Sequence, residues 1–347
     1  RGMGDGLDLY AVDVIWVHRF AKWSEPLDKY FTENEKQRIL PQPLESCYSG
    51  GELVAVPLNM VQGVMYYRED LLSKMKNGQK IIDKIKKGIT WEEFIKLKQQ
   101  LNVQNPFYIF PAADYEGFIC SVMEFLMSMD RDYFQNYGFN LEKPEAQKAI
   151  QMMVDLVNKY GMTPPVVTKF TEVTSYQYFI KNDGLFIRGW PSYDRDFKDS
   201  PVDTEKEKYL RKAPLPHFAE GKPASVIGGW NLMVSKFSNK KKEVIDFVKF
   251  LLSDSSQEVF YRESRYYPIV KKIIYDSTYE KKYPELKEIR ELIGTSVHRP
   301  FNSEYTRYSK IMSNFFEQAL KNQITVKEAL MKATNAIQLE RSAVKEF

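Results

Sequence analysis

The sequence is poor in the residues that build covalent and metal-bound frameworks. Its 347 residues include only two cysteines, Cys47 and Cys120, and three histidines. Two cysteines are too few for a disulfide framework, and neither stands in a metal-binding spacing, so they are either two buried thiols or one bridge. Because His18, His217 and His298 are widely separated, a histidine metal site has little to build from. We therefore expect no metal.

Segments that mark membrane-spanning and nucleic-acid-binding proteins are also missing. A bilayer-spanning helix needs roughly 18 to 20 apolar residues, whereas the longest apolar candidate, 117–129, is short and contains Glu124. No signal peptide stands at the start, although a mature or trimmed chain would have none. The 50 Lys and Arg residues against 46 Asp and Glu give a net charge of only +4, so we expect no nucleic-acid partner.

The motifs of common nucleotide and hydrolase sites are absent as well. There is no G-x-x-x-x-G-K-[ST], no G-x-G-x-x-G and no G-x-S-x-G. The double glycine at 228–229 is followed by Trp230, whose indole would obstruct a phosphate cradle. We therefore expect no cofactor. Asp13, Glu116 and Asp194 could pair as glycosidase carboxylates, but the sequence gives no distance between them, so a glycosidase is only a remote alternative.

Aromatic residues are what the sequence has in excess. They make up 14% of the chain, with 22 Tyr, 22 Phe and 5 Trp. Many must lie in the core, but the excess of Tyr suits a protein that recognises its ligand with rings that carry a polar edge. The chain is also long enough for two domains, since single cores stop growing at about 250 to 300 residues.

Strand-like and helix-like segments alternate along most of the chain, which is typical of an α/β protein. Helix starts are marked by capping boxes at Thr90 and Thr325 and by a proline at Pro144. The predicted strands are 7–12, 53–58, 63–68, 106–110, 184–190 and 228–234.

A helix is also predicted over 242–252. Val244, Phe247, Val248 and Leu251 recur there at helical spacing, so we expect these four side chains to form one face that packs on a sheet.

Polar and aromatic residues gather directly after several predicted strands. The clearest case is Asp13 with Trp16, because a carboxylate accepts hydrogen bonds from sugar hydroxyls and an indole covers the C–H face of a sugar ring. An equally plausible structural interpretation is that Asp13 caps a helix and Trp16 lies in the core. Ligands of open α/β sheets bind beyond the carboxyl ends of strands. The ligand-binding candidates in these loops are Asp13, Trp16, Asn59, Gln62, Glu116, Trp190, Trp230 and Asn231.

Taken in order, segments of the chain resemble a known family. The stretch 8–16, Asp-Leu-Tyr-Ala-Val-Asp-Val-Ile-Trp, is followed by Phe20-Ala21 and by Pro26-Leu27-Asp28. The ordered set is similar to the extracytoplasmic solute-binding proteins of ABC sugar importers, in particular the trehalose/maltose-type receptors. The other matching segments are 53–57, 63–72, 90–93, 188–191, 228–231, 265–268, 299–300 and 324–330.

The resemblance implies a two-lobed, type II periplasmic-binding-protein fold with a hinge and an interlobe cleft. Lobe 1 would contain 1–61 with 230–271, and lobe 2 would contain 62–229 with 272–347. The function implied is binding of a di- or oligosaccharide outside the cytoplasm and its delivery to ABC importer permease subunits, without catalysis. A monomer is implied, with membrane attachment only through a possible lipid anchor. The alternative is a receptor of the same fold for a non-sugar solute or for signalling.

The resemblance also assigns roles to single residues. It implies that Asp13 binds sugar hydroxyls, that Trp190 and Trp230 contact the sugar, and that Arg299 donates from the cleft wall. Tyr267, within the matching segment 265–268, is a further candidate.

Three departures from the family pattern affect ligand choice and completeness. Gln62 stands where close relatives have an acidic residue, which argues against trehalose. His18 and Arg19 are unusual at their positions; they favour an acidic or differently substituted sugar, or belong to a surface loop. The family begins roughly fifty residues before the 8–16 segment, so we expect an N-terminally incomplete chain, whose sheet would have unpaired edges.

Overall fold

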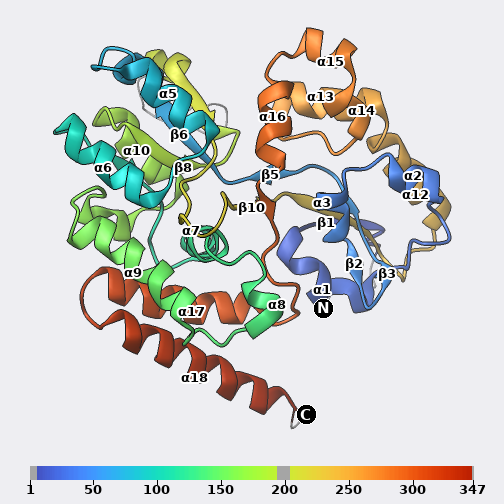
Figure 1. Ribbon diagram of the computed structural model, residues 1–347. Helices are drawn as coiled ribbons and strands as arrows, with labels where there is room; N and C mark the ends of the chain where they lie inside the picture. The colour runs from blue at the N-terminus through green and yellow to red at the C-terminus, as the bar shows by residue number, and fades with distance from the viewer. Residues whose placement is uncertain (1–5, 194–203, 346–347) are drawn as a thin grey trace. The chain divides into compact units, whose positions relative to one another are not determined.

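The chain passes three times between two units in the computed structural model, which describes residues 6–193 and 204–345 (Figure 1). Unit 1 contains residues 1–62 and 227–305, and unit 2 contains 63–226 and 306–347. The crossings therefore lie at 62–63, 226–227 and 305–306.

One sheet of unit 1 is built from three strands in the order β1-β11-β4, and both pairings are antiparallel. Asp13, the last residue of β1, lies opposite Trp230, the first residue of β11. The strands and helices are β1 Leu9–Asp13, η1 Val14–Trp16, α1 Val17–Phe20, η2 Ala21–Trp23, α2 Glu33–Gln37, α3 Pro41–Glu45, β2 Tyr48–Ser49, β3 Glu52–Leu53, β4 Val56–Pro57, β5 Val61–Gln62, β11 Trp230–Val234, α12 Lys241–Leu251, α13 Asp254–Ser264, α14 Lys271–Tyr275, α15 Ser277–Lys282, α16 Leu286–Ile293 and β12 Ser296–Val297.

Unit 1 extends further along the chain than the predicted lobe 1, which ends at 271. The structure places 272–305 in unit 1. The reason is packing: Ile273 of α14 and Ile289 of α16 belong to the same buried cluster as Val12 of β1. These helices carry no signal in their own sequence that tells which sheet they cover.

The sheet of unit 2 has four strands in the order β7-β8-β6-β9, of which β7 and β8 are parallel and the other pairs antiparallel. The apolar run at 117–129 forms most of α7, a helix buried from Gly117 to Met127. Helix α9 packs against both α7 and α18 (Figure 1). The elements are β6 Val64–Arg68, α4 Glu69–Leu72, α5 Gly78–Lys87, α6 Trp91–Leu101, β7 Tyr108–Ile109, α7 Glu116–Met127, α8 Tyr133–Tyr137, α9 Pro144–Asn158, η3 Pro165–Lys169, α10 Glu172–Lys181, β8 Phe186–Gly189, η4 Thr204–Tyr209, β9 Leu210–Ala213, α17 Tyr305–Leu320 and α18 Val326–Lys345.

Two of the three crossing segments are hydrogen-bonded to each other. Strand β5 pairs with β10 (Ser225–Gly228), with Gln62 opposite Ile227. One residue further along, the Gly63 amide donates to the Val226 carbonyl at 3.1 Å. These two crossings therefore form one paired ribbon.

Local sequence signals match the structure well. The capping boxes at Thr90 and Thr325 are both formed, with amide-to-hydroxyl distances of 3.2 Å each. Pro144 is the first residue of α9. The predicted strand 53–58 is split, because β3 forms a hairpin with β2 while β4 pairs with β11.

The prediction that Phe247 faces the core is wrong. Helix α12 buries Val244, Ile245 and Val248, but Phe247 is 50% exposed and stacks on Phe250, which is also exposed. Val244 and Val248 are buried as predicted, but the buried face continues toward Ile245 rather than toward Phe247.

Cys47 and Cys120 are free and buried, which settles the choice that the sequence left open. Burial raises the pKa of the Cys47 thiol. Within residues 6–193 and 204–345, no group of three or more His, Cys, Asp or Glu side chains could hold a metal ion. In the same residues, no helix combines the length and apolar character needed to cross a membrane.

A buried ion pair links three elements of unit 2. Arg188 of β8 donates from Nε and Nη2 to the two carboxylate oxygens of Glu124 in α7, at 2.9 and 2.8 Å. Glu124 also accepts the Val226 amide at 3.2 Å. Arg188 and Glu124 are 0% and 4% exposed. Burial alone would lower the pKa of Arg188, but the charge and hydrogen bonds of Glu124 raise it, so the guanidinium stays charged.

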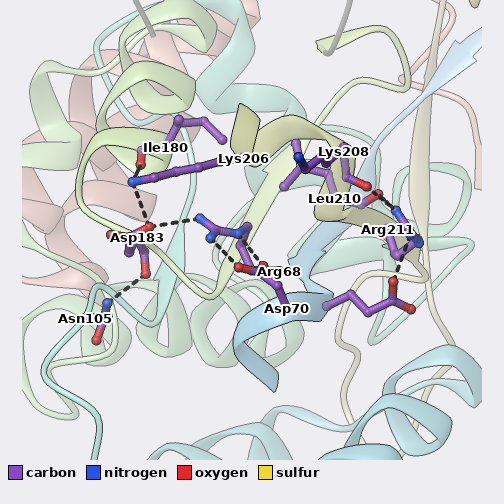
Figure 2. Close-up of polar contacts among 10 residues, drawn as sticks. Arg68, Asp70, Asn105, Ile180, Asp183, Lys206, Lys208, Leu210 and Arg211 are labelled. Atoms are coloured by element: carbon purple, nitrogen blue, oxygen red, sulfur yellow. Dashed lines mark hydrogen bonds and ion pairs between the residues drawn. The ribbon is translucent and has the colours of Figure 1, made fainter. Parts of the chain in front are cut away.

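A second polar cluster fixes the segment that leads into β9 (Figure 2). Arg68, at the end of β6, donates to both oxygens of Asp70 at 2.7 Å and to Asp183 at 3.1 Å. Lys206 of η4 pairs with the same Asp183 oxygen at 2.9 Å. The hydrogen bond from Lys206, aided by Arg68, lowers the pKa of Asp183. Because Arg68 is buried, this cluster attaches η4 to the end of β6, an inner strand of the sheet.

We expect Glu124→Gln to lower the free energy of unfolding by about 3 to 5 kcal/mol, because it leaves the Arg188 guanidinium buried without a counter-charge. Urea denaturation measures the loss. A matched control is Glu220→Gln, which breaks an ion pair with Lys148 whose side chains are 60% and 47% exposed. That loss should stay below about 1 kcal/mol. Similar small losses in both variants would contradict a dominant role for the buried pair.

Candidate functional site

Asp13 joins the end of β1 to the next helix and to a buried cation. Its Oδ1 accepts the Ile15 amide at 3.1 Å, which caps η1. The same oxygen lies 3.4 Å from Nη2 of Arg299. The interpretation of Asp13 as a cap is therefore confirmed, yet a third of the side chain (33%) stays exposed to solvent. Capping and ligand binding can thus be done by one carboxylate.

Trp230 lies directly across the strand pair from Asp13. Its amide donates to Oδ1 of Asn59 at 3.2 Å, and its carbonyl accepts the Leu58 amide at 2.8 Å. Gly229 has φ of +127°, and a Cβ there would stand 2.5 Å from the Asn59 carbonyl oxygen. The backbone is therefore fixed on both sides of the residue, while the indole is 41% exposed.

Trp16 is also a surface residue rather than a core one. Its side chain is 37% exposed, and it makes an edge contact with Phe20 at 6.3 Å between ring centroids. The alternative interpretation, in which Trp16 lies in the core, is wrong. Three of the predicted residues, Asp13, Trp16 and Trp230, thus reach solvent near the same end of the β1–β11 pair.

Arg299 anchors a small pocket beside Asp13. It is 5% exposed and donates from Nη2 to the Ile227 carbonyl at 3.2 Å. Sequence reasoning missed His298 and Phe301 in this pocket; their position beside Arg299-Pro300 was the signal that could have found them. The pocket is lined by Val14, Ile15, His18, Ile227, His298, Arg299, Pro300 and Phe301.

Besides Asn59 and Arg299, three further predicted ligand residues of unit 1 are buried and engaged in the fold. Gln62 is 0% exposed and donates to the Leu292 carbonyl at 2.7 Å, and Ser296 donates to its amide oxygen. Asn231 is also fully buried and donates to Ser46 at 3.0 Å. Tyr267 lies within the core cluster, where burial raises the pKa of its hydroxyl. In this conformation none of the three presents its side chain to solvent.

The two candidates of unit 2 lie at separate elements. Glu116 is the first residue of α7 and accepts a hydrogen bond from Ser309 of α17. Trp190 follows β8, is half-buried and lies over the Arg188 guanidinium at 4.1 Å. The ion pair with Glu124 therefore also fixes the cation beneath the Trp190 ring. Asp194, named as a glycosidase alternative, lies outside the described residues.

The chain resembles a known protein family. A family model described as bacterial extracellular solute-binding protein matches residues 3–258. A probable ABC transporter-binding protein of Deinococcus radiodurans is 26% identical, with 98% of this chain and 80% of the relative covered.

Solved structures give the same result for the fold. Maltose-bound MalE3 of T. maritima is 27% identical with a TM-score of 0.80, covering 97% of this chain and 85% of its own. A maltotriose-bound protein of Thermus thermophilus is 19% identical with a TM-score of 0.71, covering 96% and 86%. The predicted two-lobed, type II periplasmic-binding-protein fold is confirmed.

We expect Gly229→Ala to destabilise unit 1 by about 1 to 3 kcal/mol, because the added Cβ strains the backbone and meets the Asn59 carbonyl. Thermal unfolding measures this loss. Gly51→Ala is the matched control, since Gly51 has φ of +85° but no atom within 4 Å of the added Cβ. A loss at Gly229 no larger than that at Gly51 would show that the close approach of Asn59 does not matter.

Proposed function

Because the chain belongs to the bacterial extracellular solute-binding proteins, we propose that it binds a carbohydrate outside the cytoplasm and delivers it to an ABC importer. The observation that carries this proposal is the exposed pair of Asp13 and Trp230 on adjacent strands. A sugar ring needs hydrogen-bond acceptors for its hydroxyls and a flat apolar surface for its C–H face. Unit 1 supplies both within one strand pair.

The names of the similar proteins support carbohydrate as the ligand class. The T. maritima structure contains maltose and the Thermus thermophilus structure contains maltotriose. A further structure of this fold from Thermotoga lettingae, 21% identical, contains α-D-tagatose. Because these sugars differ in size and identity, they support a carbohydrate as the ligand without selecting one.

We propose binding without turnover. A glycosidase needs two carboxyl groups about 5 to 9.5 Å apart across the scissile bond. Of the carboxylates considered for that role, Asp13 is already shared between the Ile15 amide and Arg299, and Glu116 accepts from Ser309 in the other unit. These groups serve as fixed acceptors. Incubation with maltotriose, followed by chromatography, should therefore return the intact sugar.

The remaining properties implied by the resemblance are proposals as well. These are the interlobe position of the ligand, a monomeric state and attachment to the membrane by no more than a lipid anchor. The sites of Trp190 and Glu116 in unit 2 are part of the same proposal, as a second surface that contacts the sugar.

We expect at least one saccharide to raise the melting temperature of the protein, because a ligand at 100 times its Kd stabilises the folded state by about 2.7 kcal/mol. The panel should include maltose, maltotriose, trehalose, cellobiose, a uronic acid and a polyamine, scanned by differential scanning fluorimetry. If the polyamine alone raised the melting temperature and no sugar did, the result would contradict the carbohydrate assignment and favour a receptor for another solute.

We expect Trp230→Ala to weaken saccharide binding by about 1 to 3 kcal/mol, because it removes an exposed ring beside Asp13. Titration calorimetry measures the change. Trp23→Ala is the matched control: Trp23 lies in unit 1 near Ser235, at the opposite end of the β1–β11 pair. Equal affinity of the Trp230 variant and the control would contradict the site.

Trp190→Ala should weaken binding by a similar amount, about 1 to 3 kcal/mol, if its ring contacts the sugar. Because Trp190 also covers Arg188, the variant needs a stability measurement beside the titration. Trp190→Phe keeps a ring over the guanidinium and should retain more affinity than Trp190→Ala. An unchanged affinity in Trp190→Ala would remove this residue from the site.

A further inference from the structure

Phe301 is an exposed aromatic ring that is not part of the sugar site proposed at Asp13 and Trp230. It follows Arg299-Pro300 in unit 1, and 46% of it is exposed. An aromatic ring exposed in a pocket can be covered by a ligand, which would bury apolar area that now faces water. The neighbours of this ring fix it in place.

The ring of Phe301 contacts two histidines. His18 of α1 stacks on it, with centroids 5.1 Å apart and planes 10° apart. His298 contacts it at 4.9 Å with planes inclined by 50°. His298 is itself held by Glu45, 3.2 Å from its Nε2. An exposed ring fixed in this way loses little conformational entropy when a ligand covers it.

The histidines act here as rings rather than as cations. Burial lowers the pKa of His18 below its ordinary value. Burial also lowers the pKa of His298, although Glu45 opposes the shift. Burial therefore disfavours the charged form of both imidazoles, while the charge of Arg299 is matched by Asp13 at 3.4 Å. These groups favour a neutral ligand over the acidic sugar that His18 and Arg19 suggest in the sequence.

The pocket that contains the fixed ring lies beside Asp13. Phe301 lines it together with Arg299, the ion-pair partner of Asp13, and with Val14 and Ile15, which directly follow Asp13. A sugar ring held at Asp13 and Trp230 therefore has a second aromatic surface within the same unit.

We propose that Phe301, stacked on His18, is a subsite for an additional neutral sugar ring, so that the protein takes oligosaccharides longer than a disaccharide. The inference rests on the proposed carbohydrate function and deepens it. A contact between a sugar and an aromatic ring depends on a flat apolar surface rather than on a particular hydroxyl pattern. The subsite therefore selects for chain length more than for the identity of the added sugar.

Phe301→Ala tests the subsite by comparing affinities for disaccharides and trisaccharides. The probes are maltose with maltotriose and cellobiose with cellotriose, titrated by calorimetry against the intact chain. In the series that binds, we expect the fold-loss for the trisaccharide to exceed that for the disaccharide by about five- to tenfold. Phe301→Trp should restore the preference for the trisaccharide.

Phe247→Ala is the matched control. Phe247 is an equally exposed phenylalanine of unit 1, 50% exposed, and it stacks on Phe250 of α12 instead of lining the pocket. It should leave both affinities unchanged. Circular dichroism melting of both variants checks that they are folded.

The outcomes separate the two proposals. Equal losses for both sugar lengths, no loss in Phe301→Ala, or a wild-type protein that binds disaccharides but no trisaccharide would each overturn the subsite and leave the carbohydrate function standing. Failure of every saccharide to bind the wild-type protein would overturn both.

Discussion

The ion pair between Glu124 and Arg188 is the constraint on which most of unit 2 depends. A carboxylate this deeply buried must have its charge matched and its oxygens hydrogen-bonded. Arg188 supplies two donors and the Val226 amide a third. A Cβ on Gly63 would stand 1.9 Å from the Glu124 carboxylate, so any other residue there would have to displace that carboxylate. Gly63 and Val226 adjoin two of the crossings between the units. The ion pair therefore sets the backbone where the paired ribbon begins, and through Arg188 it also supports the Trp190 ring.

In unit 1, too, single polar groups serve several purposes. Asp13 is the last residue of a strand, and its Oδ1 both caps a helix and pairs with Arg299. Trp230 exposes its ring because Asn59 and Gly229 hold its backbone. The groups proposed to bind a sugar are therefore also groups that the fold needs. A substitution at any of them changes stability together with affinity, and control positions at the other end of the same strands separate the two effects.

Much of the local structure was predictable from the sequence, because its causes are local. Capping boxes at Thr90 and Thr325 depend on residues three positions apart. A glycine at 229 indicates a close approach of backbone, and the Asn59 carbonyl makes that approach. The side chain of Gln62 was not predictable, since its partners Leu292 and Ser296 lie more than 200 residues away. A loop amide looks the same in sequence whether it faces a ligand or a buried carbonyl.

Other residues were missed or misplaced for the same reason, because their surroundings come from distant parts of the chain. Phe247 was assigned to the wrong face because two neighbouring stripes of α12 are both apolar, and only the sheet decides between them. For Phe301 the only signal was its position beside Arg299-Pro300, and its fixed orientation depends on His18, far away in the sequence, which stacks on it. Fixed rings and fixed acceptors reduce the entropy lost on binding. A protein that binds without reacting depends on rings and acceptors that are fixed before the ligand arrives. In unit 1 each exposed ring is fixed by backbone or side-chain contacts that the fold already makes.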